Sequence, residues 1–242
     1  MNLIIDIGNS QIKTAVFEDN TLVLKANYPH LDWEINLKKK QERFPKINQI
    51  VVSNVGNIEN EALKRVFTTQ KWFEVTRDTQ FPYTNLYQTP QTLGIDRMVL
   101  AAGAVLQFPA QNRLIIDAGT CITYDFVDNQ DRYLGGSISP GIHMRYQALH
   151  DYTAKLPLLT AHHPENVLGD STEQAIHSGV VSGVLFEIDG VIADYQSKYE
   201  NFIIILTGGD ADFLAKRLKN TIFANPNFLL ESLNQLFQYN QK

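Results

Sequence analysis

The sequence has a single cysteine, Cys121, among its 242 residues. One thiol excludes an internal disulfide and a zinc site built from several thiolates, so we expect a reduced, cytoplasmic environment. Basic residues are also scarce, because 21 Lys and Arg face 26 Asp and Glu and leave a net charge of -5. A chain without a basic excess is poorly suited to nucleic-acid phosphates or anionic lipid, and we expect neither partner.

Long hydrophobic runs are missing as well. The aliphatic segment 202–206 falls far short of the roughly 20 residues that cross a bilayer. Residues 1–6 contain a carboxylate and no basic leader, which argues against a signal peptide. Since 44% of the residues are hydrophobic and 19% are charged, we expect a soluble globular protein.

Short β-branched runs alternate with longer helical patterns along the whole chain, which predicts an α/β fold. The patterns predict strands at 2–7, 12–17, 21–28, 48–53 and 203–207, and helices at 34–44, 58–69, 94–107, 173–199 and about 210–219.

An internal repeat divides the sequence into two halves. Residues 114–119 (LIIDAG) match residues 3–8 (LIIDIG) at five of six positions. In both copies an aliphatic strand ends in Asp-x-Gly and a second strand follows at once, which predicts a hairpin with glycine at its tip. We therefore expect two related domains, residues 1–112 and residues 113–242.

Glycine in such a hairpin serves two purposes. It adopts backbone angles that are closed to other residues, and it lets peptide N–H groups approach a phosphate without a Cβ in the way. A single Asp-x-Gly is a common turn, but two equivalent copies are suited to holding a polyphosphate. A carboxylate that faces a phosphate requires a cation, so Asp6 and Asp117 would need one, and Mg²⁺ fits Asp6.

Neither the Walker motif nor the Rossmann glycine motif occurs, so the sequence belongs to neither of those nucleotide-binding classes. Lys13, five residues beyond Gly8, either points at the same phosphates or is a solvent-facing strand lysine. An acid and base pair formed by Asp6 and Asp117, as in glycosidases, is less consistent with the flanking glycines.

Six short motifs occur in the order found in type III pantothenate kinases, and the sequence resembles that family over nearly its whole length. They are residues 6–13 (DIGNSQIK), 94–97 (GIDR), 117–120 (DAGT), 135–141 (GGSISPG), 153–157 (TAKLP) and 206–209 (LTGG). The resemblance implies two ribonuclease-H-like domains, as in actin and sugar kinases, with mixed sheets flanked by helices and an ATP cleft between them. It also implies ATP-dependent phosphorylation of pantothenate to 4′-phosphopantothenate, the first step of coenzyme A biosynthesis.

The resemblance also implies individual roles. Asp96 would be the general base, and Asp117 would bind a monovalent cation, K⁺ or NH₄⁺. The ATP-binding residues would be Asp6, Ile7, Gly8, Asn9, Ser10, Gln11, Ile12, Lys13 and Thr120, with residues 207–209 supporting the nucleoside. Pantothenate would contact Tyr87, Gly94, Ile95, Asp96 and Arg97, and Thr172 from the neighbouring subunit of a homodimer with a shared active site.

Each of these side chains also has a simpler interpretation. Asp96 stands where a helix begins and could cap it, and Arg97 could form a surface ion pair, although its guanidinium also suits the carboxylate of pantothenate. Tyr87 could be a packed aromatic residue, and Thr172 could cap the helix that follows it. Cys121 is a small packing residue, because no histidine stands near it in a recognisable catalytic pattern.

Two other activities are compatible with a pair of phosphate hairpins. One is a nucleotide sensor that does not transfer phosphate, and the other is a phosphohydrolase that delivers the phosphoryl group to water. The intact 94–97 motif argues against the sensor.

Overall fold

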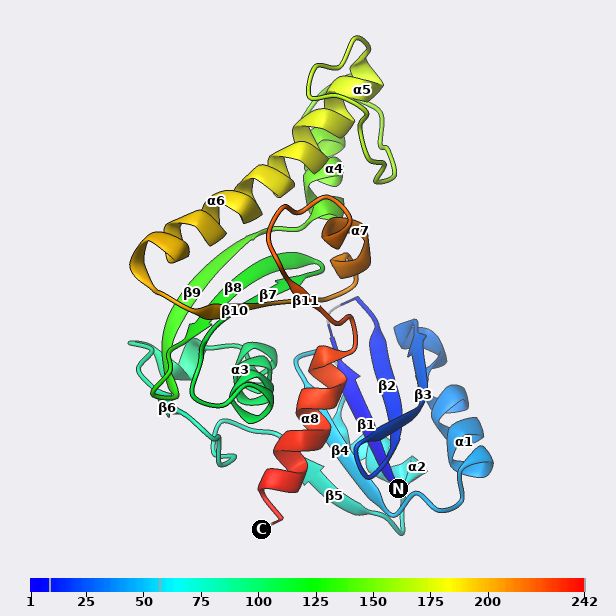
Figure 1. Cartoon of the computed structure of the whole chain (residues 1–242). Coiled ribbons are helices and arrows are strands. Elements are labelled where there is room, and N and C mark those ends of the chain that lie inside the picture. Colours follow the sequence, from blue (N-terminus) through cyan, green and yellow to red (C-terminus); the bar gives the residue numbers. More distant parts are fainter. Residues whose placement is uncertain (9, 57, 242) are drawn as a thin grey trace. The chain divides into compact units, whose positions relative to one another are not determined.

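The computed structural model describes residues 1–8, 10–56 and 58–241, which form two compact units (Figure 1). The first unit contains residues 1–109, 131–133 and 227–242, and the second contains residues 110–130 and 134–226. These units differ from the expected domains 1–112 and 113–242. The difference arises mainly because the C-terminal segment, residues 227–242, belongs to the first unit.

The first unit is built on a mixed sheet of strands β1 (Asn2–Ile7), β2 (Ile12–Glu18), β3 (Thr21–Tyr28), β4 (Gln49–Asn54) and β5 (Lys71–Glu74). Its strand order is β3-β2-β1-β4-β5. β1 and β2 form the antiparallel hairpin, and β1 pairs with β4 in parallel. Alternate β1 residues therefore face opposite sides of the sheet, with Leu3, Ile5 and Ile7 in one core.

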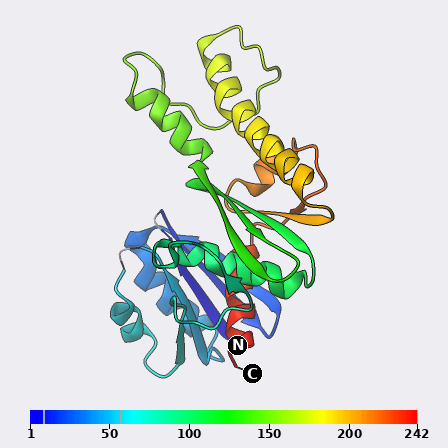
Figure 2. The ribbon, with the colours of Figure 1, turned by 90° about the vertical axis from the view of Figure 1, so that its left-hand side faces the viewer.

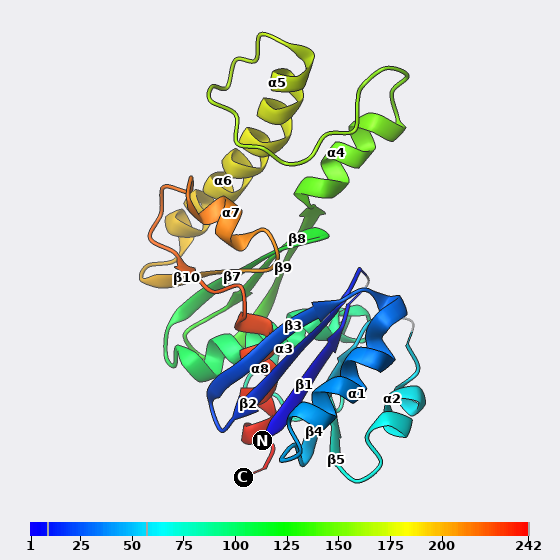
Figure 3. The same cartoon turned by 90° about the vertical axis from the view of Figure 1, so that its right-hand side faces the viewer.

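Helices cover both faces of this sheet (Figure 3). α1 (Trp33–Arg43) and α2 (Asn60–Val66) bury Leu37 and Leu63 in the core formed by Leu3, Ile5 and Ile7. On the opposite face, α3 (Ile95–Gln107) packs against α8 (Phe228–Tyr239), which also contacts β1, β2 and β4. A division of the chain into two consecutive halves does not predict that α8 belongs to the first unit.

The second unit repeats the strand topology of the first. Its strands are β7 (Asn112–Ala118), β8 (Cys121–Val127), β9 (Arg132–Pro140), β10 (Phe202–Thr207) and β11 (Phe223–Ala224), in the order β11-β10-β7-β8-β9. β7 and β8 form the antiparallel hairpin, and β10 pairs with β7 in parallel, as β4 pairs with β1. The repeat predicted from residues 3–8 and 114–119 is thus a repeat of structure. A short strand, β6 (Thr84–Asn85), pairs with Arg132 and Tyr133.

The helices of the second unit are α4 (Ile142–Asp151), α5 (Thr172–His177), α6 (Gly183–Lys198) and α7 (Ala211–Ala215). A π-helical segment, Ser178–Ser182, joins α5 to α6, so one helix runs from Thr172 to Lys198. Figure 2 shows α4 and α5 extending beyond the strands of this unit. By length and composition the helix Thr172–Lys198 could cross a membrane, but half of its most apolar stretch is buried, as in the core helix of a globular unit.

Most of the expected elements are present with small shifts at their ends. The helix expected at 58–69 is shorter, Asn60–Val66, and the one expected at about 210–219 is confined to Ala211–Ala215. Helix ends are the least predictable part of a sequence pattern, because the terminal turns lack half of their backbone hydrogen bonds.

Candidate functional site

The first hairpin joins β1 to β2 through residues 8–11. The Gly8 N–H donates to the Gln11 carbonyl at 3.2 Å, and Asp6 lies directly across the ladder from Lys13. Lys13 is half-buried, so it is not a freely solvated strand lysine. Ser10 is exposed at the tip, and Asn9 lies outside the described residues.

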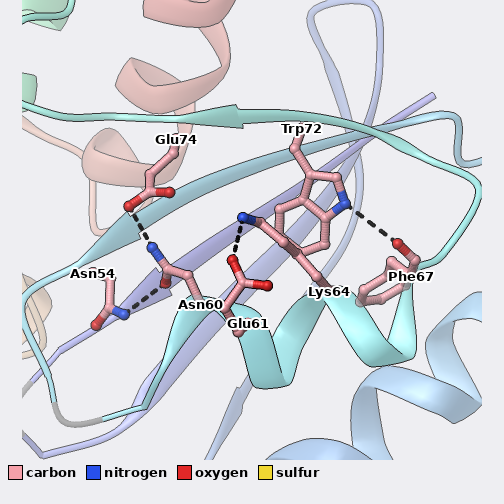
Figure 4. Close-up of polar contacts among 7 residues, drawn as sticks. All are labelled: Asn54, Asn60, Glu61, Lys64, Phe67, Trp72 and Glu74. Carbon is pink, nitrogen blue, oxygen red and sulfur yellow. Dashed lines mark hydrogen bonds and ion pairs between the residues drawn. The ribbon is translucent and has the colours of Figure 1, made fainter.

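A loop after β4 braces this hairpin. A Cβ on Gly56 would lie 2.9 Å from the Gly8 carbonyl oxygen, so only glycine fits there. The Asn54 side chain accepts from the Gly56 N–H at 3.1 Å and donates to Asn60, which donates in turn to Glu74 of β5 (Figure 4). The hairpin thus rests on a hydrogen-bonded network rather than on free loops.

The carboxyl group of Asp6 is buried on the face of the sheet that α3 covers. The pKa of Asp6 is raised to about 6, mainly by burial; the Lys13 ammonium opposes this rise, and the negative charge of Asp96 adds to it. Residues 6, 13 and 96 therefore share one electrostatic environment, although 83 residues separate Lys13 from Asp96 in sequence. A buried carboxylate whose pKa is raised and which interacts with other charged side chains is typical of a functional site.

The candidate substrate turn lies at the start of α3. Gly94 is the N-cap residue, and Asp96 lies in the first turn, where its Oδ1 accepts the Arg97 N–H at 2.8 Å. A Cβ on Gly94 would lie 2.4 Å from Asp96 Oδ1, so glycine makes room for the carboxylate. Asp96 is therefore not the N-cap residue of the helix, although its carboxylate accepts a hydrogen bond from a backbone N–H in the first turn.

Arg97 and Tyr87 extend this turn. Arg97 is only 6% exposed, which excludes a surface ion pair, and its guanidinium carbon lies 5.9 Å from the centre of the Tyr87 ring. Tyr87 also packs against Tyr133, with ring centres 6.1 Å apart. Tyr87 is therefore a packed aromatic residue that faces a buried cation, an arrangement that holds both side chains in place.

The second hairpin joins β7 to β8 through residues 118–121. The Gly119 N–H donates to the Cys121 carbonyl at 2.9 Å, and Thr120 is exposed at the tip. Gly141, at the end of β9, braces it as Gly56 braces the first, because a Cβ there would lie 2.1 Å from the Gly119 carbonyl oxygen. The Gly141 N–H also donates to the Thr120 carbonyl at 3.1 Å.

The third glycine turn closes on the same hairpin from β10. Gly208 has a φ of +95°, and a Cβ there would lie 2.5 Å from Asp117 Oδ1 and 2.2 Å from the Ala118 carbonyl oxygen. Only glycine tolerates both the backbone angle and this close approach. Asp117 is flanked in register by Thr123 and Thr207, so its carboxylate lies among oxygen-bearing side chains.

Thr172 belongs to the second unit and lies on α5. It is the exposed first residue of α5, and the residue that caps this helix is Ser171, whose hydroxyl accepts from the Gln174 N–H at 3.3 Å. The interpretation of Thr172 as the cap is therefore wrong. Its neighbours Ser171 and Glu173 line a cavity of about 540 Å³ in the second unit.

The carboxylates fit a magnesium ion that a nucleotide brings with it. Within residues 1–8, 10–56 and 58–241, no three His, Cys, Asp or Glu side chains gather closely enough to hold a metal. Mg²⁺ in phosphate sites takes one or two carboxylates, with water and phosphate oxygens as its other ligands. The buried Asp6, whose charged form is unfavourable without a counter-ion, matches this ligand type.

Sequence reasoning missed the Gly56 brace and the side chains that hold it. The signal was present, because Asn54-Val55-Gly56 ends an aliphatic strand in the same polar-x-Gly pattern as residues 6–8 and 117–119. The 135–141 motif is visible in the sequence, but its contact with the second hairpin depends on backbone packing that no local sequence pattern indicates.

Solved structures share this fold over nearly the whole chain. The activator of 2-hydroxyisocaproyl-CoA dehydratase from Clostridium difficile, solved with ADPNP, is 12% identical, with a TM-score of 0.56 over 99% of this chain and 95% of that one. A Campylobacter jejuni structure described as a Baf family protein reaches 0.64 at 23% identity over 99% and 98%. At such identities the likeness concerns the fold alone, which is that of actin-like ATPases and sugar kinases.

The family within this class follows from sequence. A model of type III pantothenate kinase matches residues 2–194. Type III pantothenate kinases from Flavobacterium johnsoniae and Christiangramia forsetii are 57% and 45% identical, covering 99% and 100% of this chain and 98% and 99% of theirs. The chain belongs to the type III pantothenate kinase family.

Family membership decides among the three activities considered from the sequence. The protein is a kinase that phosphorylates pantothenate in coenzyme A biosynthesis, with ATP and a divalent metal ion. A sensor without phosphoryl transfer and a hydrolase that uses water as acceptor are thereby excluded.

Proposed function

We propose that Asp96 is the general base of this kinase. It would accept the proton of the primary hydroxyl of pantothenate while that oxygen attacks the γ-phosphorus of ATP, which gives 4′-phosphopantothenate and ADP. The observation that supports this assignment is that Asp96, at the start of α3, lies close enough to Asp6 for its charge to raise the pKa of Asp6, which is paired with Lys13 across β1 and β2. Because Asp96 Oδ1 is engaged by the Arg97 N–H, Oδ2 is the oxygen assigned to the proton.

The substrate side of the site would be formed by Tyr87 and residues 94–97. The buried Arg97 guanidinium suits the carboxylate of pantothenate, since it can donate two parallel hydrogen bonds. Its contact with the Tyr87 ring limits its motion and so lowers the entropy lost on binding.

The nucleotide side would use residues 6–13, Thr120 and the turn at 207–209. Backbone N–H groups at the glycine hairpins and the Lys13 ammonium would stabilise the charge that spreads over the transferred phosphoryl group. Asp6 would hold Mg²⁺, which when bound neutralises charge on the phosphate oxygens. Asp117 would hold a monovalent cation, K⁺ or NH₄⁺, and the dependence of rate on potassium concentration tests this.

We further propose a cytoplasmic homodimer in which Thr172 contacts the substrate bound mainly by the neighbouring subunit. The exposed position of Thr172 on α5 leaves its hydroxyl accessible to such a partner. The single cysteine is consistent with a reducing compartment.

The experiment that tests the catalytic assignment is the Asp96→Asn substitution. Asparagine keeps the shape of the side chain but cannot take a proton, so we expect kcat to fall by about 10²–10⁴-fold. ADP release is measured with and without pantothenate, and ATP affinity is measured separately by calorimetry. Unchanged ATP affinity with the lower kcat supports the role, whereas near-native turnover would exclude Asp96 as the base.

A further inference from the structure

A half-buried ion pair in the second unit is connected to the second hairpin through one short backbone segment. Arg145, on α4, donates through Nη2 to Glu187 of α6, with 22% and 27% of the two side chains exposed. The same guanidinium donates through Nε to the Pro140 carbonyl at 2.8 Å and through Nη2 to the Ser139 hydroxyl at 2.8 Å. One side chain thus ties two helices to the end of β9.

Gly141 connects these hydrogen bonds of Arg145 to the second hairpin. Gly141 follows Pro140 directly and lies against the Gly119 and Thr120 carbonyls, so closely that a Cβ there would overlap both. The Gly141 N–H also donates to the Thr120 carbonyl. A shift of the Pro140 carbonyl therefore displaces the backbone that supports residues 119–120.

Glu187 is held in turn by a second partner. The Tyr124 hydroxyl, from the strand that leaves the hairpin, donates to Glu187 Oε1 at 2.7 Å. Burial opposes the charged carboxylate, but hydrogen bonds from Arg145 and Tyr124 outweigh it and hold the pKa of Glu187 below its usual value. The carboxylate is therefore ionised and bonded on both oxygens, which fixes the guanidinium geometry.

We propose that Arg145 and Glu187 are positioning residues for the second hairpin, and through it for ATP. The pair acts by holding Pro140 and Gly141 against residues 119–120, and it touches no substrate. This inference rests on the proposed nucleotide role of Thr120. Loss of the pair should weaken ATP binding selectively, because pantothenate is assigned to Tyr87 and residues 94–97.

The test compares Arg145→Lys and Glu187→Gln with wild type in the full-length protein. Lysine keeps the charge but cannot reach the three acceptors that the planar guanidinium bonds, and glutamine keeps an acceptor for Tyr124 while removing the charge. We expect the KM for ATP to rise by about tenfold in each variant, with the KM for pantothenate within about twofold of wild type. The double variant should be no worse than the single ones, because both remove one connected interaction.

A matched control is Asp194→Asn, which breaks the exposed ion pair Asp194–Lys198 on the same α6 helix and should change neither KM. Hydrogen–deuterium exchange of the peptide covering 117–123 provides a readout without substrates. It should accelerate in the Arg145 and Glu187 variants and stay at the wild-type rate in Asp194→Asn.

The variant Thr120→Ala separates this inference from the proposed nucleotide role. If Thr120→Ala leaves the KM for ATP unchanged, the proposed nucleotide role of the hairpin is wrong. The positioning role is tested separately: it is wrong if hydrogen–deuterium exchange of the 117–123 peptide is unchanged in the Arg145 and Glu187 variants. If Thr120→Ala raises the KM for ATP while Arg145→Lys and Glu187→Gln do not, or if they raise both KM values equally, the inference is wrong.

Discussion

At the scale of single residues, the buried carboxylate of Asp6 shows how this site trades stability for function. A charged group removed from water destabilises the folded state unless a partner compensates, and Lys13 compensates only in part, because the pKa of Asp6 remains raised. In the working enzyme the magnesium ion proposed for this position would supply the missing positive charge. Under this proposal, the electrostatic cost of burying Asp6 would be offset in the complex with nucleotide and metal rather than by the fold alone.

The substitution Asp6→Asn should consequently stabilise the protein free of nucleotide and metal while it abolishes activity. A pKa near 6 in the folded state against 3.8 in the unfolded state corresponds to about 3 kcal/mol at neutral pH, and we expect a gain of about 1–3 kcal/mol. Urea unfolding in the presence of a metal chelator measures it.

The pH dependence of this stability difference gives a control. Between about pH 4 and 6 the folded protein binds more protons at Asp6 than the unfolded chain, so the contribution of Asp6 to stability falls as pH rises through that window. The advantage of Asp6→Asn should therefore shrink toward pH 4. An advantage that is equal at pH 4 and pH 7.5 would contradict the explanation.

At the scale of secondary-structure elements, glycines set how closely neighbouring segments approach. Gly56 and Gly141 let a following segment rest on each hairpin, and Gly103 does the same for the packing of α3 against α8. A Cβ on Gly103 would lie 1.8 Å from Ser232 Oγ and 2.5 Å from its Cβ. Because Ser232 is fully buried, it has no free space into which to move.

Gly103→Ala should therefore destabilise the first unit in spite of the better helix propensity of alanine. Overpacking of a close helix contact costs about 1–3 kcal/mol, and chemical denaturation measures the loss. Gly190→Ala on α6 is the matched control, since nothing lies within 4 Å of its added Cβ, and alanine there should stabilise by about 0.5–1 kcal/mol. Equal effects of the two substitutions would rule out the packing explanation.

At the scale of the whole molecule, the duplicated topology gives each unit one glycine hairpin and one parallel strand beside it. The two units share this topology but differ in the elements added to it. The first unit adds α3 with the proposed substrate turn, and the second adds the long helix Thr172–Lys198.

The proposed shared active site predicts complementation between two inactive variants. Thr172→Glu places a carboxylate against that of pantothenate and should be inactive, as Asp96→Asn should be. In a symmetric dimer, an equimolar mixture that exchanges subunits forms mixed dimers with one intact site, which restores about one quarter of wild-type activity. Light scattering establishes the dimer, and a mixture no more active than its components would exclude a shared site.

Much of the fold could be predicted from local pattern. The strands, both hairpins, the long helix expected at 173–199 and the repeat all follow from periodicity and glycine spacing, because backbone conformation responds to neighbouring residues. The family motif at 94–97 also predicts a role for Asp96 from the sequence alone.

The tertiary structure alone decided which distant residues meet. It brought Asp96 within reach of the charge on Asp6, returned α8 to the first unit, and joined Arg145 to Glu187 across 42 residues of sequence. Such contacts depend on how sheets and helices pack in three dimensions, and a linear pattern of residue types does not encode separations of that length. The sequence by itself determined the hairpins and their glycines, whereas the packing around them decided which side chains hold each hairpin in place.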